Sequence, residues 1–274
     1  MTTQRAPVIF VSHGSPMLAV EPGALGAKLA ELGKHWDQVR GIVVVSPHWQ
    51  TKALKVGSHL QPETIHDFGG FPSVLYTLNY PAPGSQALAQ QVLQTLALSG
   101  IQAELDTAQG LDHGVWVPLL HLRPQADIPV VPVSLPVDAT PETVFALGLA
   151  LGSLRDQGIA IVGSGSMTHN LNEFRGAGVT QPQAYVTEFS NWVRSHTETR
   201  DIKSMIHYRT QAPHAVRAHP TDEHFLPLFV ALGASSEQDS MQILDTEVRY
   251  GMLSMESYAW GNLDLDSNQN TTEV

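Results

Sequence analysis

The chain has 274 residues, of which 42% are hydrophobic and 15% are charged, against about 25% charged residues in an average soluble protein. Acidic residues outnumber basic ones by 26 to 15, and a formal net charge of −11 argues against binding to nucleic acid or to an anionic membrane. Because the chain contains no cysteine, disulfides, thiolate metal sites and a cysteine nucleophile are excluded.

Runs of apolar residues alternate with amphipathic segments along the whole chain. In chain order we expect a strand at 7–12, a helix at 23–38, strands at 41–46 and 53–58, a helix at 85–99, a strand at 101–106, a helix at 115–122, a strand at 128–135, a helix at 141–156, a strand at 158–163, a helix at 182–199 and a short helix at 222–232. Residues 61–84 are irregular and rich in Gly, Pro and aromatic side chains, which is typical of a functional loop.

Three prolines refine these expectations. Residues 41–45 are one glycine and four β-branched residues, a pattern typical of a strand buried on both faces, and Pro47 should end it because proline has no N–H to donate. Pro132 indicates that the strand at 128–135 lies at a sheet edge or contains a bulge. In the last helix we expect Thr221 to be the N-cap and Pro227 to distort the helix.

The order of elements predicts an α/β fold with a mixed sheet covered by helices on both faces. We expect a single catalytic domain over residues 1–274, with a core at 7–260 and a frayed tail at 262–274. Residues 1–12 do not have the composition of a signal peptide, and no run approaches 18 consecutive apolar residues. The expected location is therefore the cytoplasm, away from membranes, and the oligomeric state cannot be deduced.

Histidines follow three of the predicted buried strands. His13, His48 and His169 each lie just beyond a strand and beside Gly, Ser or Pro residues, which let a ligand approach the backbone. Because α/β sheets bind ligands at the carboxyl ends of their strands, we predict that these imidazoles meet at one metal. His224 lies in the first turn of the predicted helix at 222–232, where the helix dipole disfavours protonation, so it is a further candidate ligand or else part of a cap.

Two other features bear on the chemistry of this site. His113 lies between Asp112 and Trp116 and is either a proton donor, a substrate contact or an ordinary structural residue. Imidazole ligands without cysteine indicate catalytic zinc or non-haem Fe(II). Gly163-Ser-Gly165 lacks the third glycine of a dinucleotide-binding loop, and Asp67-Phe-Gly69 lacks the other motifs of a kinase.

Seven motifs occur in an order that resembles a known family. They are Ser12-His-Gly-Ser-Pro-Met17, Ser46-Pro-His-Trp49, His66-Asp-Phe-Gly-Gly-Phe-Pro72, Tyr80-Pro-Ala-Pro-Gly84, Leu111-Asp-His-Gly-Val-Trp-Val-Pro-Leu119, Gly163-Ser-Gly-Ser-Met-Thr-His-Asn170 and His219-Pro-Thr-Asp-Glu-His224. Over about residues 7–260 the chain resembles the class III extradiol ring-opening dioxygenases of the DOPA-dioxygenase type, which are relatives of LigB.

The resemblance implies a metal in a cleft at the strand ends. It assigns the metal to His13, His48 and His224, makes His169 the acid/base, which can also approach a zinc ion, and makes His113 a second histidine for protons or substrate. More distant relatives of the protocatechuate type have a glutamate as the third ligand. His224 stands at that position here, so Zn(II) becomes a plausible occupant beside the Fe(II) expected for activity.

We therefore expect the enzyme to open the ring of a catechol such as DOPA with O2. Aromatic residues would wall the substrate ring, with Phe68, Tyr80 and Trp116 as the predicted contacts and Phe71 and Tyr76 nearby. The alternative function is a zinc-dependent hydrolase that uses a metal-bound water, for which Glu223 is the candidate general base.

Overall fold

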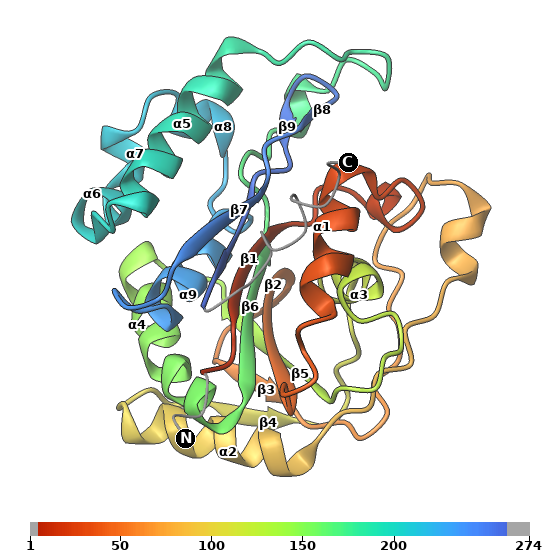
Figure 1. Ribbon diagram of the computed structural model, residues 1–274, viewed down its shortest axis with the longest axis vertical. Helices are drawn as coiled ribbons and strands as arrows, with labels where there is room; N and C mark the ends of the chain where they lie inside the picture. The colour runs from red at the N-terminus through yellow and green to blue at the C-terminus, as the bar shows by residue number, and fades with distance from the viewer. Residues whose placement is uncertain (1–4, 262–274) are drawn as a thin grey trace, which may run out of the picture.

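Four parallel strands form the centre of the sheet in a computed structural model that describes residues 5–261 (Figure 1). In spatial order they are β5 (Val130–Pro136), β2 (Gly41–Thr51), β6 (Ile159–Gly165) and β1 (Val8–Ser12). Beyond β5 lie β3 (Lys55–Gly57) and β4 (Glu104–Asp106), and beyond β1 lie β10 (Ser257–Trp260) and β7 (Met241–Asp245). Because β3 and β10 run antiparallel to their inner neighbours, the predicted mixed sheet is confirmed.

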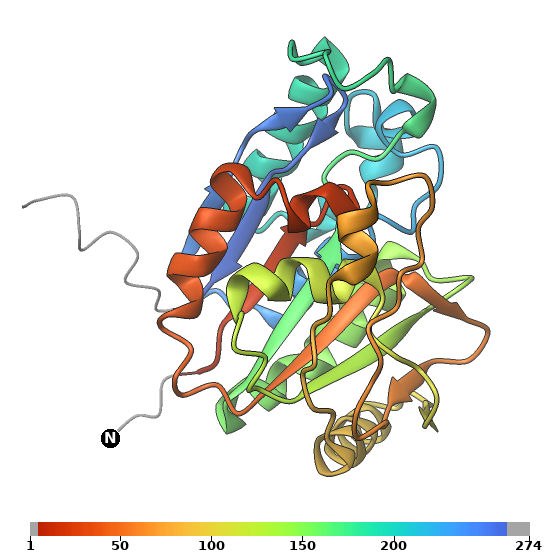
Figure 2. The same cartoon turned by 90° about the vertical axis from the view of Figure 1, so that its right-hand side faces the viewer.

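Helices cover both faces of this sheet. On one face lie α1 (Gly23–Gly33) and α3 (His113–Leu122), which stand in front of the strands in Figure 2. On the other face lie α2 (Gln86–Leu98), α4 (Pro141–Gly152), α5 (Ala184–Glu198) and α9 (Pro227–Ala234). Shorter elements are η1 (Pro16–Ala19), η2 (Ser73–Thr77), η3 (Ser153–Gln157), η4 (Leu171–Glu173), α6 (Ile202–Ile206), α7 (Tyr208–Gln211), α8 (Ala215–Ala218) and the hairpin of β8 (Val248–Arg249) and β9 (Leu253–Ser254).

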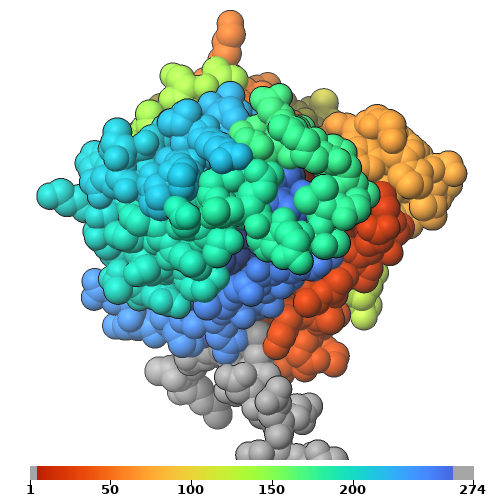
Figure 3. Space-filling view, turned by 90° about the horizontal axis from the view of Figure 1, so that it is seen from above, coloured from red at the N-terminus to blue at the C-terminus, as the bar shows by residue number. Residues whose placement is uncertain are grey.

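The central strands are apolar on both sides because each of their faces packs into its own core. Along β2, Val43 and Val45 join the core beneath α4 and α9, while Ile42 and Val44 join the core beneath α1 and α3. This alternation explains why the sequence of the strand shows an unbroken apolar run. Viewed from above, the segment after β6, drawn green to cyan, covers the left and centre of the surface and adjoins the N-terminal segments, drawn red to orange, at the right (Figure 3).

Two predictions about strands are corrected. β2 does not end at Pro47 but continues to Thr51, although its pairing with β6 stops at Val45 and its register with β5 shifts between Val45 and Gln50. β5 lies inside the sheet and not at its edge, whereas the expected irregularity is present, since its register with β2 shifts between Val133 and Leu135. Its pairing with β3 is also reduced to the single residue pair Val56 and Val133. A strand with so little pairing on one side tolerates the missing proline N–H.

Two predictions about helices are also corrected. α1 ends at Gly33 rather than at residue 38. The last predicted helix begins at Pro227, not after Thr221, because the N–H groups of Phe225 and Leu226 bond to the carbonyl of Asp222 and close a turn first. Pro227 occupies the first helical position, where a missing N–H costs nothing, so it starts α9 rather than distorting it.

Glycines let β6 come unusually close to the segment that leads into α9. A Cβ on Gly163 would lie 2.0 Å from the carbonyl oxygen of Pro227, and a Cβ on Gly165 would lie 2.3 Å from the carbonyl oxygen of His224. The same carbonyl of His224 accepts a hydrogen bond of 2.8 Å from the N–H of Ser166. These two glycines therefore have a packing role that places His224.

We expect Gly165→Ala to destabilise the protein and to displace His224. Overpacking of this kind costs about 1–3 kcal/mol, which corresponds to a fall in Tm of about 3–10 °C in a domain of this size. Thermal melts and metal titrations of the variant measure both effects. Gly69→Ala is the matched control, because a methyl there meets no atom of residues 5–261 within 4 Å, and an equal loss in both variants would contradict the packing role.

The predicted frayed tail at 262–274 lies outside the described residues, and the extent of the domain stays a prediction. Among the helices found between residues 5 and 261, none has the length and apolar character needed to cross a membrane.

Candidate metal centre

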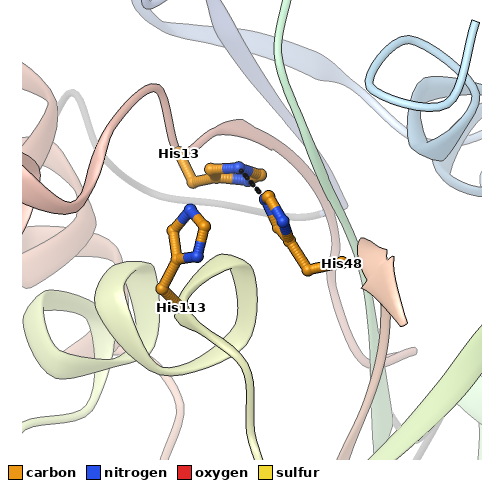
Figure 4. Close-up of side chains that lie close together, drawn as sticks. All are labelled: His13, His48 and His113. Carbon is orange, nitrogen blue, oxygen red and sulfur yellow. Dashed lines mark hydrogen bonds between the residues drawn. The ribbon is translucent and has the colours of Figure 1, made fainter. Parts of the chain in front are cut away.

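Five histidines from separate parts of the chain gather at the carboxyl edge of the central strands. His13 directly follows β1, and His48 lies in the irregular part of β2. His113 is the first residue of α3, His169 follows β6, and His224 lies in the turn before α9. Figure 4 shows the rings of His13, His48 and His113 pointing toward one another.

The closest contact joins His13 and His48, whose Nε2 atoms are 3.1 Å apart, as the dashed line in Figure 4 marks. Two imidazoles that bind one ion at about 2.1 Å with ordinary bond angles place their nitrogens about 3.0–3.4 Å apart and their ring centres about 4.5–5.3 Å apart. The centres of the His13 and His48 rings are 5.1 Å apart. The pair therefore already has the spacing of two ligands of one metal.

A third imidazole is available on either side of this pair. The His224 ring centre lies 5.1 Å from that of His48 and 5.9 Å from that of His13, close to the spacing of co-ligands. His113 also brings a nitrogen within 4.8 Å of ligand atoms of His13 and His48. Its ring centre is only 4.0 Å from that of His48, which is closer than two ligands of one ion normally approach. Ligand atoms of His13, His48 and His113 lie within 4.8 Å of one another, and so do those of His169, Glu223 and His224, so His224 as the third ligand beside His13 and His48 stays a prediction.

Polar partners at Nδ1 of His13, His48 and His224 leave the Nε2 atoms of these rings free to bind a metal. Ser164 donates its hydroxyl proton to the carbonyl of Gly114, so it must accept the bond of 3.0 Å from Nδ1 of His13. Nδ1 of His224 lies 3.1 Å from Oε1 of Glu223. Nδ1 of His48 lies 3.4 Å from Oδ2 of Asp67. Partners of this kind fix the tautomer and the orientation of metal-binding histidines.

Burial favours the neutral form of His13, His48 and His169, which is the form that metal binding requires. It lowers the pKa of His13 well below its ordinary value, and the neighbouring histidines lower it further. Burial likewise lowers the pKa of His48 to about 2 and that of His169 to about 3. The hydrogen bond from His224 lowers the pKa of Glu223 to about 2, so this carboxylate is an anion at neutral pH.

His169 lies flat against His224, with ring centres 3.5 Å apart and an angle of 6° between the planes. Ligand atoms of His169, Glu223 and His224 also lie within 4.8 Å of one another. The role of His169 as a metal ligand therefore stays a prediction. Its position beside the proposed centre suits proton transfer.

The aromatic residues divide into two groups. Phe68 meets the edge of His113 at 5.7 Å and also contacts Phe71 and Tyr76. Trp116 is fully buried, and its indole N–H donates to the carbonyl of Ile65. It therefore packs behind the Phe68 ring and fixes the loop that carries Phe68.

Tyr80 lies elsewhere, because its hydroxyl donates to the carbonyl of Arg123, the residue that follows the last residue of α3. His113 begins that helix, about 15 Å away along its axis. The structure does not bring Tyr80 to the histidines, and its predicted contact with the substrate is corrected. The reason is a long-range contact, since the carbonyl of Arg123, 43 positions further along the chain, offers an acceptor to the buried phenol.

Sequence patterns gave no sign of the residues that orient the histidines. Asp67 stands in the His66-Asp-Phe-Gly-Gly-Phe-Pro72 motif and Ser164 in the Gly163-Ser-Gly-Ser-Met-Thr-His-Asn170 motif, but neither motif assigns an orienting role to them. Glu223, the candidate general base of a hydrolase, accepts hydrogen bonds from His224 and Thr221. The sequence signal for Ser164 is its position on β6 between Gly163 and Gly165. Because side chains alternate along a strand, the side chain of Ser164 lies on the sheet face opposite to the face of these two glycines.

We expect Glu223→Gln to weaken metal binding by about 10–100-fold, because the carboxylate no longer orients His224. Competition with a chromophoric chelator measures the affinity. The matched control is Glu188→Gln, which breaks the surface pair of 2.8 Å between Glu188 and His214 and should leave the affinity unchanged. Equal affinities of the Glu223→Gln variant and the wild type would exclude this orienting role.

Comparison with known proteins gives consistent matches over nearly the whole chain. Residues 7–260 match the family described as the catalytic LigB subunit of aromatic ring-opening dioxygenase. The chain is 37% identical to a 4,5-DOPA dioxygenase extradiol of Escherichia coli K12, over 95% of this chain and 97% of that protein. It is 36% identical to a protein of the same name from Beta vulgaris, over 91% and 94% of the two chains.

A solved structure also matches. The crystal structure of an uncharacterized protein from Escherichia coli K12 superposes with a TM-score of 0.76 at 31% identity, and the match covers 93% of this chain and 99% of that one.

Proposed function

Because the chain belongs to the LigB family of aromatic ring-opening dioxygenases, we propose that His13, His48 and His224 hold its catalytic metal. The protein is an extradiol ring-opening dioxygenase, an oxidoreductase, and the alternative of a zinc-dependent hydrolase is wrong. The observation that best supports the ligand set is the 3.1 Å approach of two Nε2 atoms whose rings are oriented through Nδ1.

The enzyme depends on a metal, and we propose Fe(II) for activity and Zn(II) as a second occupant of the same donor set. Three neutral imidazoles suit both ions. When bound, Fe(II) supplies Lewis acidity that lowers the pKa of a catechol hydroxyl and the electron-transfer chemistry that O2 requires. Every other part of the reaction falls to side chains of the protein.

His169 is the proposed general base, because it is neutral and stands beside His224. It takes a proton from a catechol hydroxyl and later returns one to the opened ring. His113 is the second catalytic histidine, since its Nδ1 bonds to Asp67 and leaves Nε2 to face His13 and His48. Phe68 packs against the substrate ring, with Trp116 behind it.

The proposed substrates are a small catechol and O2. Relatives at 31–37% identity carry the name 4,5-DOPA dioxygenase extradiol, which makes DOPA the first catechol to test. Cleavage beside the diol inserts both oxygen atoms and gives a yellow ring-opened semialdehyde. We also propose that residues 1–274 act as one catalytic domain, and the cytoplasmic location stays a prediction.

The test is to load the metal-free protein with Fe(II) under anaerobic conditions and then to add oxygen and a panel that includes DOPA and caffeate. We expect one O2 consumed per yellow product and both atoms of ¹⁸O2 in that product. Protein loaded with Zn(II) and protein treated with chelator are the controls and should consume no oxygen. The absence of oxygen uptake and of yellow product with every catechol would defeat the proposal.

A further inference from the structure

Asp67 is the shared partner of two histidines in the centre. Its Oδ2 lies 3.0 Å from Nδ1 of His113 and 3.4 Å from Nδ1 of His48. Its Oδ1 accepts a hydrogen bond of 2.9 Å from the backbone N–H of His113. One carboxylate thus contacts the ring and the backbone of one histidine and approaches the ring of another.

The backbone bond fixes the carboxylate against the start of α3. His113 is the first residue of that helix, and the N-cap residue Asp112 makes no side-chain capping bond. Asp112 instead accepts the hydroxyl of Ser46 at 2.7 Å. Asp67, which comes from the loop before η2, therefore bonds to the free N–H that a helix N-terminus leaves exposed.

The ring bond decides which nitrogen of His113 carries the proton. A carboxylate can only accept, so Nδ1 must hold the hydrogen, and the lone pair lies on Nε2. The centre of the His113 ring is 5.3 Å from that of His13, at an angle of 86°. Within residues 5–261, Asp67 supplies the carboxylate that bonds to this ring, so it controls how Nε2 is presented to the cleft.

We propose that Asp67 is a positioning residue for ring opening, which holds His113 as the Nδ1–H tautomer and braces His48 at its Nδ1. The inference rests on the proposed function of the site, because it assigns Nε2 of His113 to face the substrate. Asp67 itself touches neither the substrate nor the metal. Histidine partners of this kind typically change activity or metal affinity by about 10–100-fold.

The kinetic test is a double-mutant cycle of Asp67→Asn and His113→Asn in Fe(II)-saturated protein. We expect Asp67→Asn alone to lower kcat by about 10–100-fold with KM changed by less than about threefold. In the His113→Asn background the same change should cost less than about threefold, because both residues act through one ring. Losses that multiply in the double variant would overturn the inference, since they indicate independent roles.

A spectroscopic test does not depend on turnover. In Zn(II)-loaded protein with ¹⁵N-labelled histidine, the His113 signals are assigned by their loss in the His113→Asn variant. We expect the Nδ1–H tautomer in the wild type and a shift toward the Nε2–H tautomer in Asp67→Ala, which removes the acceptor. Persistence of the Nδ1–H tautomer in Asp67→Ala would overturn the inference.

Glu63→Gln is the matched control, because it removes one negative charge from the same loop at an exposed side chain and should change neither the kinetics nor the spectrum. The two tests also separate two kinds of failure. If no catechol reacts but the tautomer shifts as expected, the proposed function fails while the orienting role of Asp67 holds. If catechols react but the tautomer does not shift, only the inference about Asp67 fails.

Discussion

His13→Ala is expected to lose the bound metal and to lower kcat/KM by at least about 10³-fold, which corresponds to about 4 kcal/mol of transition-state stabilisation. The reason is that His13 is buried at the centre of the cluster, 3.1 Å from His48 through Nε2 and 3.0 Å from Ser164 through Nδ1. Alanine provides no nitrogen at this position. Metal content by elemental analysis and oxygen uptake with DOPA measure the two losses.

The matched control for this variant is His121→Ala. His121 lies on α3 and bonds to the carbonyl of Leu18 at 2.8 Å, so its removal deletes an imidazole and one hydrogen bond away from the metal centre. We expect the control to keep the metal and to lose only stability. A full complement of tightly bound metal in His13→Ala would exclude His13 as a ligand.

His169→Ala is expected to keep the metal and to lose turnover, with kcat lowered by about 10²–10⁴-fold, the usual contribution of a general acid or base. The physical reason is that His169 stacks on His224 at 3.5 Å, so it lies beside the proposed centre, where it can exchange a proton with the substrate. The measurements are metal affinity by chelator competition and single-turnover formation of the yellow product.

The sizes of the changes in metal affinity and in turnover decide the role of His169. Loss of the stacked ring exposes one face of His224, so a change in metal affinity of less than about tenfold is expected from altered orientation alone. A much larger loss of metal would identify His169 as a ligand. Unchanged turnover with metal in place would remove His169 from the proton-transfer chemistry.

The arrangement of the central strands could be predicted from the sequence because it depends on short-range patterns. Unbroken apolar runs mark β1, β2 and β6 as buried, and parallel strands bring their carboxyl ends to one edge. His13, His48 and His169 follow these runs, so their gathering was predictable. The continuation of β2 past Pro47 was not, since it depends on pairing with Leu135 and Pro136 of a distant strand.

Long-range partners account for the other differences. The start of α9 depends on which N–H groups the carbonyl of Asp222 accepts, and proline is compatible both with a helix start and with a helix distortion. Asp67 finds His113 across 46 positions of sequence, and no local pattern records such a contact. Tyr80 belongs to an aromatic-rich loop, but the path of that loop carries its phenol toward the end of α3.

The turn before α9 places one proposed ligand near the end of the described chain, while the ligand after β1 comes from its beginning. An ion held by both closes a very long loop and therefore acts as a reversible cross-link of the native state. By mass action, metal at a thousand times its dissociation constant adds about 4.1 kcal/mol to the free energy of unfolding. Removal of the metal by a chelator and thermal unfolding are therefore coupled, because the metal that serves the reaction also stabilises the folded protein.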